Sequence, residues 1–342
     1  AGLINSTYLV RVGPAKVSAA LLQRINRRVF PKPERIMANL RALQDHVRRR
    51  PEDPGCERSA LHLPRVLSTP SGRDYVTDAT GEVWRALGFV ANARTLRHIE
   101  HTEQATEVGR TLAWFHRLTR DLAPERLVDT LPGFHHTPGY LGRLDQVRTS
   151  AGHTLHLPEV RHGLDFVDAR RGLVHLLADA RRKGLIADRV MHGDPKLDNI
   201  LFERDGDRAL SLIDLDTVKP GLLQYDIADC LRSCCNRAGE ASERTEPVEF
   251  DLDICRSILE GYAQQSRGSV RASDTAYLYP AIRLMPLELG IRFLTDYLEG
   301  NRYFKVESPD ENLHKAMIQF RLTESIERQA QWLHRIIEEL MR

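Results

Sequence analysis

Three side chains near the middle of the chain carry oxygen atoms at a spacing that suits phosphoryl transfer. Asp194 lies 5 residues before Asn199, and Asp214 follows Asp194 by 20 residues. Phosphoryl transfer needs a carboxylate that orients an attacking hydroxyl, metal ions on the phosphates and a cation near the developing charge. Carboxylate and amide oxygens suit Mg²⁺ that is shared with substrate phosphates, and Lys196 supplies a cation beside the first carboxylate. These residues predict magnesium-dependent transfer of a phosphoryl group.

The segments around these residues predict a β-hairpin that brings them together. Residues 199–203 and 208–213 have the composition of strands, and Asp205-Gly206 between them is a typical hairpin turn. The outer ends of a hairpin meet, so the residues at the start of the first strand lie beside Asp214 and Asp216, which follow the second. An ordinary surface hairpin with polar turn residues is the alternative interpretation.

The order of the expected elements predicts two lobes. Residues 8–12 and 19–25 form an expected hairpin, and a helix with one apolar face starts at Pro33. Further strands are expected at 65–67 and 82–90, and helices at 165–185, 223–235, 252–266, 276–300 and 309–341. We therefore predict an α+β, bilobal fold, with a small antiparallel-sheet lobe in residues 1–93 and a larger, mainly helical lobe in residues 94–342. A ligand commonly binds between two such lobes.

Composition excludes several other classes of protein. The 49 basic and 47 acidic residues leave a formal charge of +2, which is too small to attract nucleic acid. No run of 18 apolar residues suggests a membrane span. The 5 cysteines do not form a disulfide framework, and Cys230, Cys234 and Cys235 lack the paired spacing of a zinc site. We expect a cytoplasmic protein whose partner is a small-molecule substrate.

One motif carries a resemblance to a known superfamily. His192-Gly193-Asp194, followed by Asn199 and Ile213-Asp214, resembles the signature of the aminoglycoside phosphotransferases and choline kinases, which have a protein-kinase-like fold. The chain looks most like the bacterial N-acetylhexosamine 1-kinase branch of that superfamily. The segments that carry this second resemblance are 2–10, 22–26, 132–135, 213–221, 225–229 and 292–305.

The resemblance implies a role for each residue of the central motif. Asp194 matches the catalytic base, and His192 matches the residue that supports its loop. Asn199 and Asp214 match the metal ligands, and Lys196 is expected to steady the phosphoryl group. Asp216 is a further candidate for the metal site.

The resemblance also implies an ATP site near the N-terminus. Gly2, Asn5 and Thr7 are expected in the strand and turn that cover the phosphates, although Gly2 is the only glycine before Asn5. The lysine that kinases place on a later strand is missing, and Arg24 or Gln23 is expected in its place. Arginine is a reasonable exchange because its guanidinium binds phosphate through two hydrogen bonds. An exposed strand arginine is the alternative interpretation for Arg24.

Four residues are candidates for contacts with the acceptor. His135 and His136 lie in a loop where the superfamily builds its acceptor pocket, although surface histidines are the alternative. Asp226 is a second candidate, with an ion-pair network under the catalytic loop as the alternative. Arg292 is expected either in the same pocket or in a core network.

Two function classes follow from these candidates. The first is a kinase that uses ATP and Mg²⁺ to phosphorylate the C1 hydroxyl of an N-acetylhexosamine, or another metabolite kinase of the superfamily such as an aminoglycoside phosphotransferase. An acidic run in residues 240–253 is the feature that favours a polycationic antibiotic. The second class is a non-catalytic nucleotide-binding protein, and the intact set of Asp194, Asn199 and Asp214 disfavours it.

Overall fold

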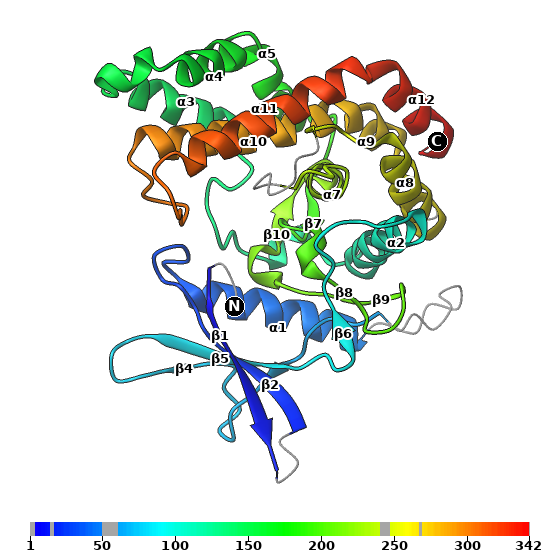
Figure 1. Cartoon of the computed structure of the whole chain (residues 1–342). Coiled ribbons are helices and arrows are strands. Elements are labelled where there is room, and N and C mark those ends of the chain that lie inside the picture. Colours follow the sequence, from blue (N-terminus) through cyan, green and yellow to red (C-terminus); the bar gives the residue numbers. More distant parts are fainter. Residues whose placement is uncertain (1–3, 14–16, 50–60, 240–246, 267–268, 342) are drawn as a thin grey trace.

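A small antiparallel sheet occupies the first 88 residues, and helices dominate the rest of the chain (Figure 1). The computed structural model describes residues 4–13, 17–49, 61–239, 247–266 and 269–341. The strands are β1 (Ser6–Val12), β2 (Val17–Arg24), β3 (Val66–Leu67), β4 (Val76–Thr77), β5 (Val83–Gly88), β6 (Ala93–Arg94), β7 (Arg189–Met191), β8 (Ile200–Glu203), β9 (Ala209–Leu212) and β10 (Lys219–Gly221).

The helices lie mainly after the sheet. They are α1 (Pro33–Arg49), α2 (Thr102–Thr119), α3 (Thr137–Arg148), α4 (Pro158–Asp168), α5 (Arg171–Val174), α6 (Leu176–Arg182), α7 (Leu223–Cys234), α8 (Leu252–Ser266), α9 (Ala272–Ala276), α10 (Leu278–Leu298), α11 (Glu311–Arg328) and α12 (Ala330–Leu340). Short 3₁₀ helices are η1 (Pro124–Arg126), η2 (Gly152–His156), η3 (Leu197–Asn199) and η4 (Leu215–Thr217). This arrangement confirms the predicted α+β, bilobal fold.

The N-terminal sheet is built around β5. Its strand order is β1-β2-β5-β3, and β4 pairs with the same strand β5. Alternate residues of a strand point to opposite faces, and Val83 and Arg85 of β5 are buried whereas Trp84 between them is partly exposed. Gln23 of β2 is the cross-strand partner of Arg85. The sheet therefore directs an arginine and a glutamine inward from adjacent strands.

A second, smaller sheet carries the expected catalytic hairpin. β8 and β9 are antiparallel, and β8 also pairs with β6, which lies at the expected division between the lobes. β7 pairs with β10, so the segments before and after the hairpin are also joined. These two ladders hold both ends of the loop that contains Asp194.

Helix α1 is fixed to the C-terminal lobe by Asn39. The side-chain amide nitrogen donates to the carbonyl oxygens of Val128 and Val218 at 2.8 and 2.9 Å, and its oxygen accepts from the backbone N–H of Val128 at 2.9 Å. Asn39 is 2% exposed, so these hydrogen bonds are shielded from water. Figure 1 shows α1 between the sheet and the helical lobe.

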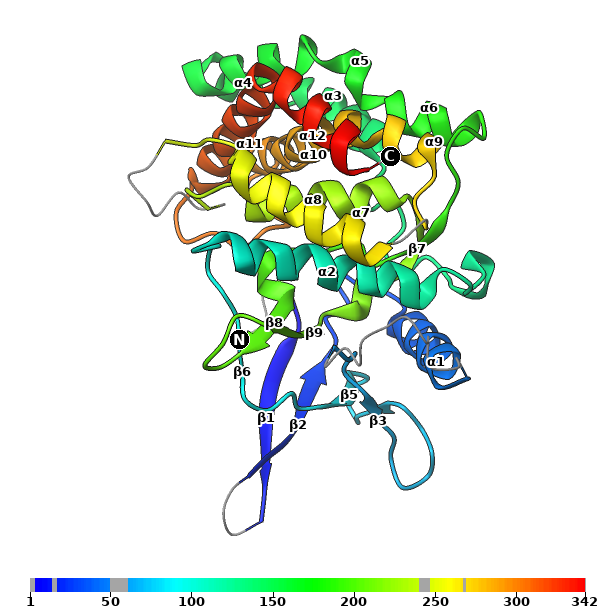
Figure 2. The same ribbon diagram turned by 90° about the vertical axis from the view of Figure 1, so that its right-hand side faces the viewer.

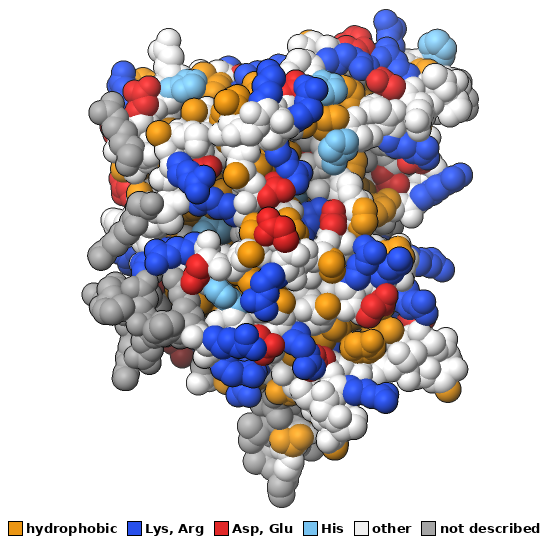
Figure 3. Space-filling model, turned by 180° about the vertical axis from the view of Figure 1, so that it is seen from behind, with side chains coloured by type: hydrophobic (Ala, Val, Ile, Leu, Met, Phe, Trp, Pro, Cys, Tyr) orange, Lys and Arg blue, Asp and Glu red, His pale blue; other side chains and the backbone are white. Residues whose placement is uncertain are grey.

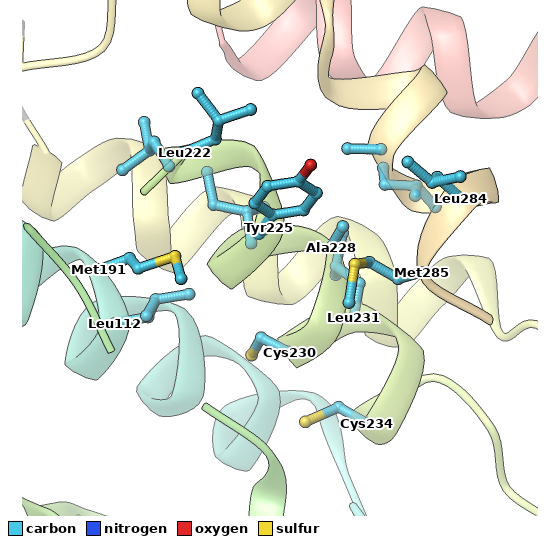
Figure 4. Packing of buried hydrophobic residues seen from close by; sticks show 14 of the residues in the cluster. Leu112, Met191, Leu222, Tyr225, Ala228, Cys230, Leu231, Cys234, Leu284 and Met285 are labelled. Carbon is cyan, nitrogen blue, oxygen red and sulfur yellow. The ribbon is translucent and has the colours of Figure 1, made fainter. Parts of the chain in front are cut away.

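In the helical lobe, α2 packs against α8, and Figure 2 shows the two helices side by side. Gly109 and Gly261 lie at the contact, where an added Cβ would come within 1.9 Å of the carbonyl oxygen of Ile258 and 2.1 Å of that of Thr106, respectively. Glycine is therefore required for the close approach of the two backbones. Helix α7 is buried nearby, and Figure 4 shows Cys230 and Cys234 among apolar side chains. Four described cysteines are free, buried thiols.

Two expected helices are divided in the structure. The segment expected as one helix at 165–185 belongs to α4, α5 and α6, and the chain leaves helical geometry at Arg170, whose guanidinium contacts Glu327 of α11 at 2.6 Å. The segment at 309–341 divides into α11 and α12 at Gln329. Both breaks turn the chain so that each short helix can bury its own apolar face.

Charged side chains of both signs lie on the surface of the molecule. Basic and acidic side chains are interspersed on the face seen in Figure 3, without a continuous basic surface there. None of the helices in the described ranges is long and apolar enough to cross a lipid bilayer.

Candidate active site

The catalytic loop and the hairpin ends meet as the sequence predicts. The backbone N–H of Ile213 donates to the carbonyl oxygen of Asn199 at 2.8 Å, which joins the start of β8 to the end of β9. The carboxylate of Asp194 accepts a hydrogen bond from Lys196 Nζ at 2.8 Å. Asn199 Nδ2 donates to the backbone oxygen of Asp194 at 2.7 Å and to its carboxylate at 3.2 Å. The loop thus brings Asp194, Lys196 and Asn199 into direct contact.

Asp214 lies at the other end of the hairpin in a left-handed conformation, with φ 61° and ψ 59°. This region is rare for a residue with a side chain, and such residues gather at functional sites. Burial, followed by the carboxylates of Asp216 and Asp194, raises the pKa of Asp214 to about 7. Burial and these two carboxylates therefore disfavour the ionised form of Asp214, although Lys196 and Arg85 act in the opposite direction.

This donor set fits a divalent cation that is shared with a substrate. Both hydrogen bonds of Asn199 use its amide nitrogen, which leaves its Oδ1 as the donor atom for a metal. Within the described ranges, no three His, Cys, Asp or Glu side chains converge closely enough to hold a metal by themselves. Mg²⁺ in kinases is commonly bound by one or two protein carboxylates together with phosphate oxygens. Asn199 and Asp214 suit that arrangement.

The catalytic loop is supported from below by Asp226 of α7. Its carboxylate accepts the backbone N–H groups of His192 and Gly193 at 2.6 and 2.8 Å and contacts His116 Nε2 at 2.9 Å. His116 continues the network to the Tyr262 hydroxyl of α8 at 2.8 Å. Asp226 is completely buried, which places it inside the ion-pair network and not among the residues that face an acceptor.

Gly193 has a conformation that this network requires. Its φ is +89°, and a Cβ at this position would lie 2.8 Å from the carbonyl oxygen of Thr217. His192 is also completely buried, with Nε2 3.0 Å from the carbonyl oxygen of Ile213. The motif His-Gly-Asp therefore combines a buried support, a tight turn and the candidate base.

Asp216 connects the two lobes. Its carboxylate contacts Arg85 Nη2 at 2.5 Å and accepts Asn5 Nδ2 at 2.7 Å. Arg85 Nε and Nη2 also donate to Gln23 Oε1 at 3.0 and 2.8 Å, and Arg85 Nη1 is a buried nitrogen without a partner in the described structure. Asp216 was expected as an additional metal ligand, but both of its oxygens face side chains of the N-terminal sheet.

The sequence interpretation missed Arg85 and placed the cation of the N-terminal lobe at Arg24. The side chain of Arg24 is 45% exposed and lies 3.3 Å from Ser6 Oγ and 3.9 Å from Glu82, whereas the side chain of Arg85 is 2% exposed. Alternation along β2 explains the difference, because Gln23 faces inward and Arg24 faces outward. The signal for Arg85 was a charged residue within the apolar strand 83–88.

The remaining candidates for the nucleotide site have different positions. Asn5 also accepts the backbone N–H of Asn26 at 2.9 Å, so it joins β1, the end of β2 and Asp216. The Thr7 hydroxyl accepts Gln23 Nε2 at 3.1 Å on the same side of the sheet as Arg85. Gly2 lies outside the described residues.

The two histidines of the acceptor loop differ in burial. His136 is exposed at the start of α3. His135 is 6% exposed, and its ring nitrogens lie 2.9 Å from Glu288 Oε1 of α10 and 2.8 Å from the carbonyl oxygen of Gly193. His135 is therefore part of the interior and contacts the residue before Asp194. The structure corrects the interpretation of His135 as a surface histidine.

Arg292 lies one turn after Glu288 on α10, within a group of aromatic rings. Its guanidinium carbon is 5.3 Å from the centre of the Phe134 ring, 5.2 Å from Tyr140, 6.0 Å from Tyr303 and 5.4 Å from Phe304. We call Arg292 and these four residues the acceptor wall, because the sequence makes Arg292 a candidate for contacts with the acceptor. Although burial opposes its charge, Tyr140, Tyr303, Glu288 and Asp194 keep the pKa of Arg292 above its usual value, so it stays charged.

The loop that supplies two of these rings is fixed by Asp296. Its carboxylate accepts the backbone N–H groups of Arg302, Tyr303 and Phe304 at 2.8 to 2.9 Å. Among the residues that the structure describes, no carboxylate forms an ion pair with Arg292. The wall therefore presents a positive charge between rigid rings, close enough to Asp194 to interact with it electrostatically.

Solved proteins with a similar fold include small-molecule kinases. Amicoumacin kinase hAmiN, solved with AMP-PNP, Ca²⁺ and amicoumacin, has a TM-score of 0.60 at 15% identity, over 96% of this chain and 87% of that one. An aminoglycoside phosphotransferase from Alicyclobacillus acidocaldarius has a TM-score of 0.59 at 15% identity, with 96% and 93% covered. A choline/ethanolamine kinase family protein from Mesorhizobium loti has a TM-score of 0.57 at 14% identity, with 100% and 91% covered. Residues 1–263 match the phosphotransferase enzyme family, and the chain therefore belongs to that family.

Proposed function

We propose that this phosphotransferase uses ATP and Mg²⁺ to phosphorylate the anomeric C1 hydroxyl of an N-acetylhexosamine such as GlcNAc or GalNAc. Asp194 accepts the proton of the hydroxyl, and an anomeric hydroxyl suits a carboxylate base because it is more acidic than an ordinary alcohol. Lys196 offsets negative charge beside this carboxylate, at 2.8 Å. Asn199 and Asp214 hold the metal ion, which when bound supplies positive charge to the phosphates.

The acceptor wall is the observation that carries the choice of a sugar. Arg292 raises the cost of placing an ammonium group near it, because like charges brought together at a binding site cost several kcal/mol. The solved neighbours include kinases of aminopropanol and ethanolamine, whose acceptors carry amino groups. A neutral sugar can instead place its apolar face on Phe134, Tyr140 or Tyr303 and its polar groups near the guanidinium.

The acidic run that favours an antibiotic acceptor contributes little to this picture. Residues 240–246 of the run lie outside the described residues. Asp251 caps the start of α8 by accepting the backbone N–H groups of Asp253 and Ile254 at 3.0 Å, and it contacts Arg237 at 2.5 Å. The carboxylate of Asp251 is therefore explained by local structure.

An acceptor panel tests the proposed function. ADP release is measured with ATP and Mg²⁺ against GlcNAc, GalNAc, glucose, galactose, choline and kanamycin, and phosphorus NMR identifies the product. We expect turnover with an N-acetylhexosamine and a phosphate on C1. Turnover with choline or kanamycin alone would support the phosphotransferase activity and contradict the choice of a sugar as the acceptor. Nucleotide binding without turnover on any acceptor would favour the non-catalytic class.

Replacing Arg292 with Gln is expected to raise the KM for the sugar by about 10- to 100-fold, because the loss of a hydrogen bond to a charged group costs about 1.5–3 kcal/mol. The KM for ATP is expected to stay the same. Arg143→Gln is the matched control, since Arg143 is exposed on the neighbouring α3 and pairs with Glu299. Equal KM values for the sugar in both variants would show that Arg292 does not contact the acceptor.

Replacing Asn199 with Ala is expected to raise the Mg²⁺ concentration at half-maximal activity by about 10- to 100-fold, and Asp214→Asn is expected to act in the same direction. A titration of activity with Mg²⁺ at saturating ATP measures the midpoint. Asp205→Asn is the matched control, because Asp205 is exposed at the opposite end of the same hairpin. An unchanged midpoint in both site variants would exclude them as metal ligands.

A further inference from the structure

Two buried histidines neighbour Gly193, and their surroundings differ. His192 precedes it in the chain, and His135 contacts its carbonyl oxygen at 2.8 Å. His192 Nδ1 receives the backbone N–H of Asp194 at 3.3 Å, and its Nε2 faces the carbonyl oxygen of Ile213 at 3.0 Å. One ring nitrogen therefore accepts a hydrogen bond and the other donates one, which is the pattern of a neutral imidazole. Burial likewise lowers the pKa of His192.

His135 has acceptors at both ring nitrogens. Nδ1 lies 2.9 Å from the carboxylate of Glu288, and Nε2 lies 2.8 Å from the carbonyl oxygen of Gly193. Neither partner can donate when Glu288 is ionised, so two good hydrogen bonds require a proton on each ring nitrogen. That pattern belongs to the imidazolium form. The backbone of His135 also has a φ of 58°, which is uncommon for a residue with a side chain.

The charged and titratable groups around His135 favour its protonated form. Glu288, which also accepts the Thr137 hydroxyl at 2.5 Å, and Arg292 face it from α10. From α7, the Tyr225 ring stacks on it at 5.2 Å, and Asp229 pairs with Arg232 at 2.7 Å. Burial alone lowers the pKa of His135, but Glu288, Asp229 and the carbonyl oxygen of Gly193 together outweigh burial and raise the pKa above its usual value.

The ring of His135 connects the acceptor wall to the catalytic loop. Phe134, the residue before it, lies over Arg292, and its carbonyl oxygen accepts Lys219 Nζ of β10 at 3.1 Å. Gly193, the partner on the other side, is the residue before Asp194. Each of the two segments is also held elsewhere, by Lys219 and by Asp226, respectively. His135 is the direct hydrogen-bond link between them.

We propose that His135 is a positioning residue. As an imidazolium between Glu288 and Gly193, it holds the acceptor wall at a fixed position relative to Asp194. The proposal rests on the proposed function only in taking Asp194 as the base, and it holds for any acceptor of the wall. Loss of the proton removes one of the two donors and leaves the buried Glu288 carboxylate without its cation, so the link weakens. A displacement of about 1 Å at a reacting group can cost about 10²-fold in rate.

The first test does not depend on turnover. Nitrogen NMR of the ring is expected to show both nitrogens of His135 protonated at pH 7 and one nitrogen of His192 unprotonated. Hydrogen exchange of residues 192–199 is expected to be faster in His135→Asn, because Asn tolerates the positive φ but cannot donate to both partners. His162→Asn is the matched control, with an exposed histidine on α4. A neutral ring in His135, or unchanged exchange in its variant, overturns the proposal.

Kinetics then separate positioning from a general loss of structure. His135→Asn is expected to lower kcat by about 10²-fold at an unchanged KM for ATP. In Glu288→Gln the pKa of His135 is expected to fall. The kcat is then retained at low pH and lost as the pH rises, and the loss is expected at a lower pH than in the wild type. A pH-independent loss in Glu288→Gln contradicts the role of the charge. If the wild type phosphorylates none of the acceptors tested, the proposed function fails while NMR and hydrogen exchange still decide this proposal.

Discussion

Replacing Asp194 with Asn is expected to lower kcat by about 10²- to 10⁴-fold, the usual contribution of a general base. An amide has nearly the size of the carboxylate but cannot take the proton of the attacking hydroxyl. Asn at this position can still accept Lys196 Nζ through its oxygen, so the loop is expected to keep its shape. Steady-state kinetics with the best acceptor measures kcat, and calorimetry measures ATP binding, which is expected to remain.

Asp198→Asn is the matched control for that experiment. Asp198 lies on the same loop and is exposed, so the change is the same while the position differs. Its kcat is expected to stay close to that of the wild type, because this surface substitution leaves the candidate base unchanged. Full turnover in Asp194→Asn would remove Asp194 from the role of base.

Replacing Arg85 with Met is expected to lower the free energy of unfolding by about 3–5 kcal/mol. Breaking a buried ion pair by removing one partner leaves an uncompensated charge, here on Asp216, whose side chain is 4% exposed. The variant also leaves Gln23 Oε1 without the donors it receives from Arg85. Urea denaturation followed by circular dichroism measures the change.

Arg24→Met is the control for this prediction, one residue along the strand from Gln23. Arg24 is exposed and its contact with Glu82 is 3.9 Å long, so its loss is expected to change stability by less than about 1 kcal/mol. Adding Asp216→Asn to Arg85→Met is expected to restore part of the stability, since the buried charge is then removed. Equal stabilities of the two single variants would show that Arg85 and Asp216 form no stabilising pair.

Residues close together in the sequence allowed the catalytic hairpin to be predicted. The spacing of Asp194 and Asn199 and the turn at Asp205-Gly206 are local features, and the hairpin geometry then determines which ends meet. The N-terminal hairpin and α1 followed in the same way from alternation, a proline at the first helical turn and an apolar face. Local patterns of this kind do not depend on distant parts of the chain.

The partners of buried charges could not be predicted, because they come from distant segments. Arg85 meets Asp216 across 131 residues, and His135 meets Glu288 across 153. Each charge nevertheless left a signal in its own segment. Arg85 interrupts an apolar strand, and Glu288 lies in the largely apolar stretch 278–294 of α10. A charged residue in such a place requires a partner, but the sequence alone does not show which residue the partner is.

The hydrogen bonds of Asn39 give the two lobes a connection besides the one at Asp216. They tie α1 to the backbone at Val128 and Val218, whereas the sheet reaches Asp216 through the side chains of Asn5 and Arg85. Arg41 of the same helix donates to Asp74, between β3 and β4, at 2.7 Å. Helix α1 therefore links the two lobes by a route that does not pass through the candidate active site.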